Sequence, residues 1–219
     1  MVDVQGLGAY SYLRVIVHSQ KKRGRPVIPG RRDHLLDAAL TLFAERGFHG
    51  TSIPDLAAAA GVAAGSIYRH VASKEQLVNE VYRGAKALLA AALLRAVPAT
   101  APLREQFHQL WWALIDFARS EPRAFAFLEL HHHGDYLDAE SRAVELRVLA
   151  PIAQVVERGR GSGVLKPLPA AALIVTVWGA FVGMVRAARA GYFTLDDDMG
   201  HHVELTAWDA IATSGSPTA

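Results

Sequence analysis

The chain has 219 residues, of which 51% are hydrophobic and none is cysteine. The apolar fraction excludes global disorder, and the lack of cysteine excludes a disulfide scaffold and any thiolate metal or redox site. The net charge of +2 is unevenly divided, since residues 1–95 carry 13 Lys and Arg against 7 Asp and Glu, whereas residues 96–219 carry 10 against 14. This asymmetry favours a polyanion-binding end attached to a second domain.

Residues 1–30 are predicted to form a flexible basic arm. An apolar stretch, residues 10–17, precedes the basic run at residues 21–26, which is the reverse of the order in a secretory signal. The run reads Lys-Lys-Arg-Gly-Arg-Pro, and Arg-Gly-Arg-Pro is the core of an AT-hook, an extended segment that enters the narrow A·T minor groove. A solvated basic tail is the alternative. We expect minor-groove contacts from Lys22, Arg23 and Arg25.

The rest of the chain has helical periodicity and almost no strand pattern, which predicts an all-α fold of about nine helices. Apolar stripes separated by Gly, Pro or capping residues predict helices over residues 31–46, 53–60, 64–71, 73–95, 103–119, 122–133, 138–159, 169–190 and 196–213. The predicted organisation has four parts. The arm is residues 1–30, and a helix-turn-helix domain follows over residues 31–76. Residues 77–213 form a helical ligand-binding and dimerisation domain, and residues 214–219 are a tail.

Residues 51–71 have the pattern of a helix-turn-helix, with two short helices joined by a tight turn at Gly61. Leu56, Ala57 and Ile67, with Val62, are predicted to pack together so that the second helix protrudes from the surface. Such a helix fits a major groove about 12 Å wide. A Ser73–Gln76 capping box is predicted to open the long helix that follows.

This region resembles the TetR family of bacterial transcriptional regulators. The match covers roughly residues 31–80 and is carried by Phe43, Gly47, Thr51-Ser52-Ile53, Leu56-Ala57, Ala60-Gly61-Val62, Gly65-Ser66-Ile67-Tyr68-Arg69-His70, Ser73-Lys74-Glu75 and Leu77. The remainder resembles the family in length, helical pattern and order of elements. Ala63 departs from the Ser that often caps the recognition helix, and Val71 stands where Phe is commoner.

The resemblance implies phosphate contacts from Tyr68, His70 and Lys74, and the hydroxyls and N–H groups of Thr51 and Ser52 offer an anion site at a helix N-terminus. Tyr68 as a packing ring and His70 as an ordinary surface residue are the alternatives. Ser66 and Arg69 are the candidates for base edges, although Arg69 could equally grip phosphate. Small residues could touch thymine methyl groups. The predicted DNA contacts beyond the arm are Thr51, Ser52, Ala63, Ala64, Gly65, Ser66, Tyr68, Arg69, His70 and Lys74.

Residues 169–190 and 196–213 resemble the two helices that form the four-helix dimer interface in this family. Small residues four apart, Gly179 and Gly183, permit close helix contact. The predicted interface comprises Val177, Gly179, Phe181, Gly183 and Trp208. Two recognition helices about 34–36 Å apart would read a palindromic operator. The uncharged stretch at residues 167–185 is short for a membrane span, so we expect a buried helix of a soluble bundle and no membrane partner.

An aromatic-rich region predicts either ordinary core or an apolar effector pocket, with Phe107, Trp111, Phe127, His131 and Trp178 as the candidate ligand-binding residues. The run of three histidines invites a metal site, but consecutive helical residues point about 100° apart and cannot share one face. The pairings of His131 with Asp135 and of Asp198 with His202 are weak. We therefore predict no metal and no cofactor.

No catalytic motif is apparent, so we do not expect an enzyme. The sequence predicts a cytoplasmic, nucleoid-associated, homodimeric transcriptional regulator, with repression favoured over activation. A small, largely apolar effector would release it from double-stranded operator DNA, and the long helix from Ser73 would transmit the signal. One alternative is a helical small-molecule-binding or metal-dependent protein whose helix-turn-helix does not act on DNA. Another is an architectural DNA binder led by the basic arm, with weak sequence preference.

Overall fold

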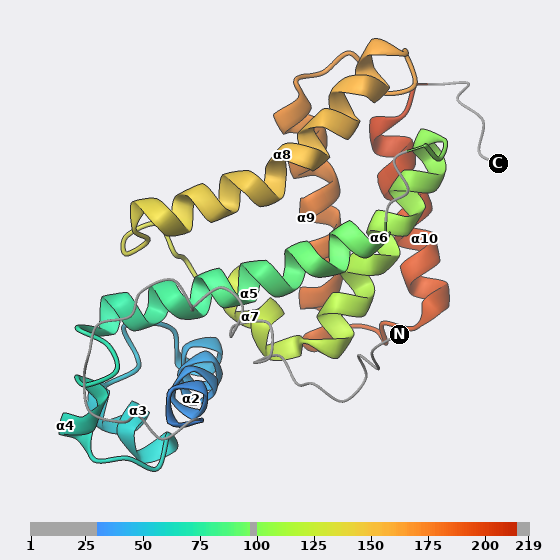
Figure 1. Ribbon diagram of the computed structural model, residues 1–219. Coiled ribbons are helices and arrows are strands. Elements are labelled where there is room, and N and C mark those ends of the chain that lie inside the picture. The colour runs from blue at the N-terminus through green and yellow to red at the C-terminus, as the bar shows by residue number, and fades with distance from the viewer. Residues whose placement is uncertain (1–29, 97–99, 214–219) are drawn as a thin grey trace, which may run out of the picture. The chain divides into compact units, whose positions relative to one another are not determined.

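The structure is a computed structural model that describes residues 30–96 and 100–213, and within these residues the chain forms nine α-helices (Figure 1). The all-α fold and the order of the helices are confirmed. The single strand-like pairing in this part of the chain is an isolated bridge between Leu165 and Ala212. The helices are α2 (Arg31–Arg46), α3 (Ile53–Ala59), α4 (Ala64–Ile67), α5 (Lys74–Ala96), α6 (Leu103–Ser120), α7 (Pro122–Leu130), α8 (Ala139–Gly161), α9 (Ala170–Arg189) and α10 (Asp197–Ile211).

Helices α4 and α7 are shorter than the apolar periodicity predicts. After α4 the Arg69 and His70 amides donate to carbonyls three residues back, at 3.1 and 2.8 Å, so the chain tightens into a turn. Helix α7 ends at Leu130 because His131 has an extended backbone, with φ −118° and ψ 150°. Apolar spacing alone did not reveal either end, because buried residues continue beyond the last helical turn.

The described residues divide into two compact units. Unit 1 comprises residues 30–89 and 121–144, and unit 2 comprises residues 90–96, 100–120 and 145–213. The predicted division at residues 76 and 77 differs from this one, because α7 packs on α2 and the first part of α5 stays with unit 1. The predicted arm residues Lys22, Arg23 and Arg25 lie outside the described residues.

The core of unit 1 fixes the helix-turn-helix. Leu56, Ala57 and Ile67 are buried, as the sequence predicts, and Val62 is half-buried. Gly61 has a φ of +65° in the turn between α3 and α4, a left-handed conformation that glycine adopts without strain. The core extends to α7 through Phe43, whose ring centroid lies 6.2 Å from that of Phe127. The recognition element, by which we mean residues 63–70, therefore stands on a support made of α2, α5 and α7.

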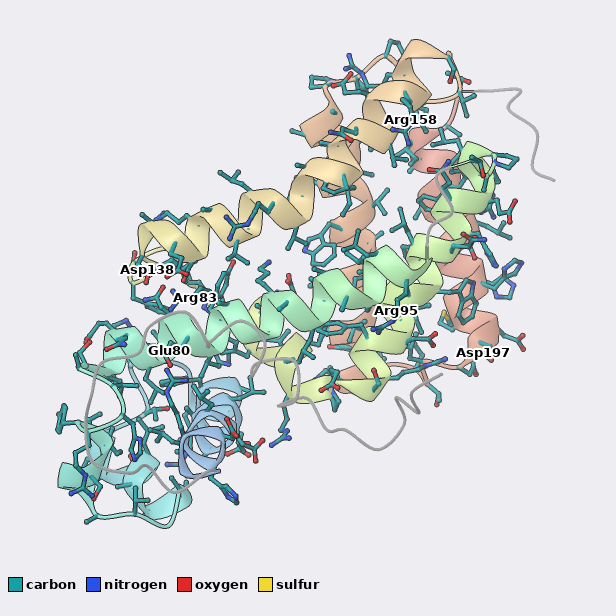
Figure 2. The ribbon with its side chains drawn as sticks, viewed as in Figure 1. Glu80, Arg83, Arg95, Asp138, Arg158 and Asp197 are labelled. Atoms are coloured by element: carbon teal, nitrogen blue, oxygen red, sulfur yellow. The ribbon has the colours of Figure 1, made fainter. Side chains whose placement is uncertain are left out.

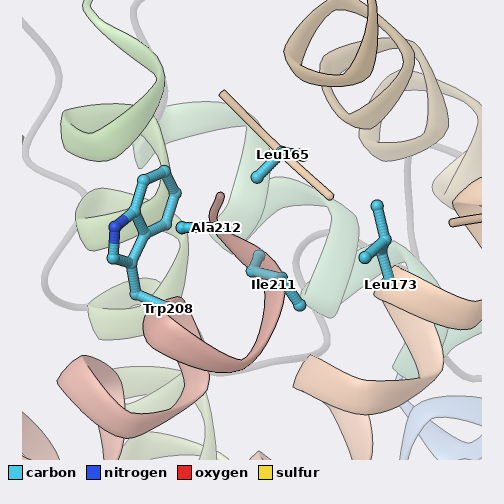
Figure 3. Packing of buried hydrophobic residues seen from close by; sticks show 5 residues of the cluster. All are labelled: Leu165, Leu173, Trp208, Ile211 and Ala212. Carbon is cyan, nitrogen blue, oxygen red and sulfur yellow. The ribbon is translucent and has the colours of Figure 1, made fainter. Parts of the chain in front are cut away.

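The core of unit 2 joins the C-terminal end of α10 to the start of α9. Figure 3 shows its central apolar side chains converging: Leu165, Leu173, Trp208, Ile211 and Ala212.

Unit 2 also contains a fully buried carboxylate, Glu204. It accepts hydrogen bonds from Arg104 at 2.6 Å, from His108 at 2.9 Å and from Trp112 at 3.0 Å, and His201 lies 3.8 Å away. Burial works to raise the pKa of Glu204, but the hydrogen bonds from Arg104 and His108 outweigh it and hold that pKa below its usual value. These contacts tie α10 to α6.

Helix α9 is apolar but largely uncovered. Its most apolar stretch has a mean hydropathy of 1.8, yet only 22% of that stretch is buried. By length and composition it is the one helix of the described residues that could cross a membrane, a test that core helices of soluble proteins also pass. The prediction of a buried helix is therefore not met within one chain. The reason is that α9 buries one face, with Leu173 and Phe181, against its own unit and leaves the opposite face, with Val175, exposed.

Candidate nucleic-acid interface

The segment from Ala63 to His70 presents its polar side chains outward while a single apolar side chain anchors it. Ile67 is fully buried, whereas Tyr68 is 57% exposed and Arg69 is also exposed. The three small residues at the start of the segment are exposed as well, and Ser66 and His70 are half-buried. The surface that the sequence predicts for DNA is thus open to solvent. A major groove could reach it without any rearrangement of the core.

The start of α4 lacks a side-chain cap. Ala63 occupies the N-cap position with an extended backbone, and its side chain makes no capping hydrogen bond. This agrees with the departure noted in the sequence, since alanine has no hydroxyl to offer the helix N-terminus. The helix depends on Ile67 for its attachment to the core.

The two candidate base-reading residues contact each other. The Nη2 group of Arg69 donates to the hydroxyl oxygen of Ser66 at 2.6 Å. Hydrogen bonds from a charged donor such as the guanidinium are shorter and stronger than those from a neutral donor. The Ser66 and Arg69 side chains therefore form one hydrogen-bonded polar group at the surface.

The start of α3 does not leave an open anion site. Ser52 caps this helix, accepting from the Asp55 amide, while its own amide and hydroxyl both donate to the Asp55 carboxylate. These hydrogen bonds from the Ser52 side chain and backbone lower the pKa of Asp55. The carboxylate thus occupies the position that we expected for a DNA phosphate. The signal was present in the sequence, because Ser-x-x-Asp before an apolar run is a capping pattern related to the capping box.

Thr51 is also engaged inside the protein. It is 1% exposed, and its hydroxyl is within hydrogen-bonding distance of the Gly47 carbonyl at 2.8 Å and of the Leu42 carbonyl at 3.3 Å. The hydroxyl therefore ties the turn to the end of α2. A phosphate contact from this side chain would require those bonds to break.

Lys74 fixes the same turn from the other side. Its Nζ donates to the Phe48 carbonyl and to the Thr51 carbonyl, each at 2.9 Å, and lies 4.1 Å from the centroid of the Phe48 ring. The side chain is half-buried. An ammonium has three donors, so these two bonds leave one N–H for another partner. Sequence reasoning missed this anchoring role because Phe48 lies 26 residues before Lys74.

The N-terminus of α5 is built largely as the sequence predicts. The Ser73 hydroxyl accepts from the Gln76 amide at 3.1 Å, while the Gln76 side chain accepts from the Ala72 amide at 2.7 Å. The reciprocal bond therefore goes to the residue before the cap. Together with Lys74, these contacts hold the start of α5 beside the recognition element.

Ion pairs brace the helices behind the recognition element. Arg83 of α5 donates to Asp138 at 3.0 Å (Figure 2), and Arg32 of α2 pairs with Glu80 of α5 at 2.6 Å. Asn79, which is buried, donates to the Tyr136 carbonyl at 2.8 Å. The Arg83 and Asn79 contacts attach the loop after α7 to α5, and the Arg32 pair attaches α2 to α5.

The candidate effector residues belong to different units. Phe127 and His131 lie in unit 1, where the His131 ring is 2.8 Å from the Ala44 carbonyl. Phe107 and Trp111 lie in unit 2 with ring centroids 6.2 Å apart, and Trp111 and Trp178 both contact Phe181. These contacts give the side chains packing partners inside their own units. Effector binding by them stays a prediction.

The candidate dimer residues differ in exposure. Phe181 and Trp208 are buried inside unit 2, and Val177 packs on its core. Gly179 and Gly183 are exposed, and a methyl group at either would meet no atom within 4 Å. Of these five residues, the two glycines are therefore the most open to another chain. The helical spacing does not distinguish the face turned to the core from the face turned to solvent.

Known protein families match both parts of the chain. Residues 35–81 match the family described as bacterial regulatory proteins, tetR family, and residues 86–213 match the family described as Tetracyclin repressor-like, C-terminal domain. Over 133 residues the chain is 32% identical to the HTH-type transcriptional repressor KstR2 of Mycobacterium tuberculosis, covering 61% of each chain. Over 55 residues it is 56% identical to KstR2 of Rhodococcus jostii, covering 25% of this chain and 27% of that protein.

Solved structures share the fold. A TetR family transcription regulator from Marinobacter aquaeolei has a TM-score of 0.75 and 26% identity, covering 84% of this chain and 96% of that one. The ketosteroid transcriptional regulator KstR2 of Mycobacterium tuberculosis has a TM-score of 0.68 and 24% identity, covering 88% and 100%. In sequence, by contrast, the chain spans about three fifths or less of the curated KstR2 proteins that it matches.

Proposed function

This chain belongs to the TetR family of bacterial regulatory proteins, and we propose that it is a homodimeric transcriptional repressor that binds a palindromic operator. A small, largely apolar effector releases it from the DNA. It acts in the cytoplasm, on the nucleoid. The observation that carries the proposal is that Tyr68 and Arg69 are exposed on a helix-turn-helix whose apolar core residues are buried.

The DNA contacts that we propose come from the recognition element and its flanks. Tyr68, His70 and the remaining N–H of Lys74 contact phosphates, and Arg69 reaches the major groove. Ala63, Ala64 and Gly65 lie against the bases without hydrogen bonds. Lys22, Arg23 and Arg25 of the arm add minor-groove contacts. We leave out Thr51 and Ser52, because their hydroxyls already bind within the protein.

We propose that a second copy covers the exposed face of α9. Its members are Ala172, Val175, Thr176, Gly179 and Gly183, which recur at intervals of three or four residues and are all exposed. Val175 alone is 68% exposed. A helix this apolar is rarely left open in a soluble protein, and small residues allow a second helix to approach closely. Phe181 and Trp208 support this face from inside.

The effector proposal rests on the aromatic side chains of unit 2 and on the relatives. A structure of KstR2 is described as that of a ketosteroid transcriptional regulator, so steroid-derived compounds are the first class to test. To lower operator occupancy tenfold, the effector must prefer the DNA-incompetent state by about 1.4 kcal/mol. Helix α5 carries the chain from unit 1 into unit 2, and we propose that it couples effector binding to DNA binding.

The test is footprinting of the purified full chain on DNA flanking its own gene, with and without steroid-derived ligands. We expect a protected palindrome that Tyr68→Ala abolishes and that a ligand of this class releases. Protection that ignores sequence would instead indicate an architectural DNA binder. Ligand binding without any salt-dependent DNA binding would indicate a small-molecule-binding protein whose helix-turn-helix serves packing alone.

A further inference from the structure

The recognition element carries one permanently charged side chain. Among residues 61–72, Arg69 is the single Lys, Arg, Asp or Glu. Arg69 follows α4, whose exposed residues are Ala64 and Gly65, and a methyl group at Gly65 would meet no atom within 4 Å. Tyr68 is a large exposed neighbour of Arg69, whereas the surface on the α4 side is low and open. Nothing bulky on α4 would keep this guanidinium from a base edge.

The backbone explains why Ser66 and Arg69 meet. The Arg69 amide donates to the Ser66 carbonyl at 3.1 Å, a bond between residues three apart, because α4 has already ended at Ile67. In this 3₁₀-type geometry side chains three apart lie one above the other. The Ser66 hydroxyl consequently falls beneath the guanidinium and accepts from its Nη2 at 2.6 Å.

We propose that Ser66 is a positioning residue that orients Arg69 toward a guanine of the operator. A guanidinium has five N–H donors, of which Ser66 engages one. Two of the others suffice for the bidentate pairing of arginine with guanine O6 and N7. Holding a long side chain in one direction before binding lowers the entropy lost when the complex forms. Ser66 therefore contributes to sequence preference without reading a base itself.

This inference rests on the proposed DNA-binding function, and one experiment separates the two. Full-length wild-type protein and the variants Ser66→Ala, Ser66→Thr, Arg69→Ala and Ser66→Ala/Arg69→Ala are each used to select sites from random-sequence duplex DNA. Affinities for the selected site, for the same site with each G·C pair replaced, and for random DNA are then measured over a salt series. Glu157→Ala is the matched control, because Arg160 contacts Glu157 three residues away at 2.6 Å in unit 2.

We expect Arg69→Ala to lose about ten- to a hundredfold preference for one guanine per half-site. Ser66→Ala should lose about two- to tenfold at that same base pair, the usual net effect of one hydrogen bond. Ser66→Thr should retain it, and the double variant should match Arg69→Ala, since coupled residues are not additive. Thermal unfolding and affinity for random DNA should be unchanged in Ser66→Ala, and Glu157→Ala should behave as wild type.

The proposal is overturned if Ser66→Ala keeps the wild-type preference or if its loss simply adds to that of Arg69→Ala. It is also overturned if Arg69→Ala weakens all sequences equally and lowers the salt slope by about 0.9 per protomer, since that result identifies a phosphate contact. A wild-type protein that selects no site at all would instead contradict the proposed function itself.

Discussion

Replacing Lys74 with methionine separates two roles of one ammonium group. The variant keeps an unbranched side chain that is one heavy atom shorter, and it loses the charge and the donors. The wild-type Nζ makes two hydrogen bonds of 2.9 Å to backbone carbonyls and lies 4.1 Å from the Phe48 ring centroid. A hydrogen bond from a charged group contributes about 1.5–3 kcal/mol, and a cation–π contact at a partly exposed site about 0.5–1 kcal/mol. Allowing for partial solvation, we expect a loss of about 2–3 kcal/mol.

The assay is urea unfolding of the full chain, followed by DNA binding over a salt series. Lys74→Met should unfold at lower urea, whereas Lys74→Arg should recover part of the loss. The phosphate contact proposed for the remaining N–H predicts in addition a salt slope that is smaller by about 0.9 per protomer. Lys166→Met is the control, because Lys166 also donates to two backbone carbonyls, at 2.7 and 3.1 Å, in unit 2. It should lower stability and leave DNA binding unchanged. Wild-type stability in Lys74→Met would refute the anchoring role.

Three further changes test the packing and the titrating groups. Gly159→Ala should lower the free energy of unfolding by about 1–2 kcal/mol, because its methyl group would lie 2.5 Å from Leu103 and 2.7 Å from Leu165, whereas Gly161→Ala, with open space, should not. Glu204→Gln should lower the free energy of unfolding, measured with urea at neutral pH, by about 3 kcal/mol. Because the pKa of Glu204 is lowered in the folded protein, its carboxylate stabilises the fold above about pH 4.5, and this stabilisation is lost as the pH falls through the folded pKa. A difference in stability between Glu204→Gln and wild type that stays constant as the pH falls would contradict this. Burial raises the pKa of Tyr136 to about 12 from 10, so wild type should lose stability as the pH rises from 10 to 12, and Tyr136→Phe should lose less.

The sequence alone was sufficient for the features that depend on residues close together in the chain. Helix α2 was predicted over the residues that form it, because its apolar stripe and Gly47 both lie within one segment. The turn at Gly61 and the burial of Leu56 and Ile67 also follow from local spacing. The exposure of Tyr68 and Arg69 follows in turn, since Ile67 occupies the inward position between Ser66 and Tyr68.

Contacts over long sequence separations were decided by the tertiary structure. Periodicity placed Phe181 on the same helix as Gly179, but only the packing showed that Phe181 is turned to the core while Gly179 is turned to solvent. His131 was predicted as a candidate effector residue, and only the packing showed that its ring also contacts the Ala44 carbonyl, 87 residues away. A residue type and its spacing define which groups a segment can offer. Which of those groups remain available to a ligand depends on the partners that folding brings to them, and those partners come from distant parts of the chain.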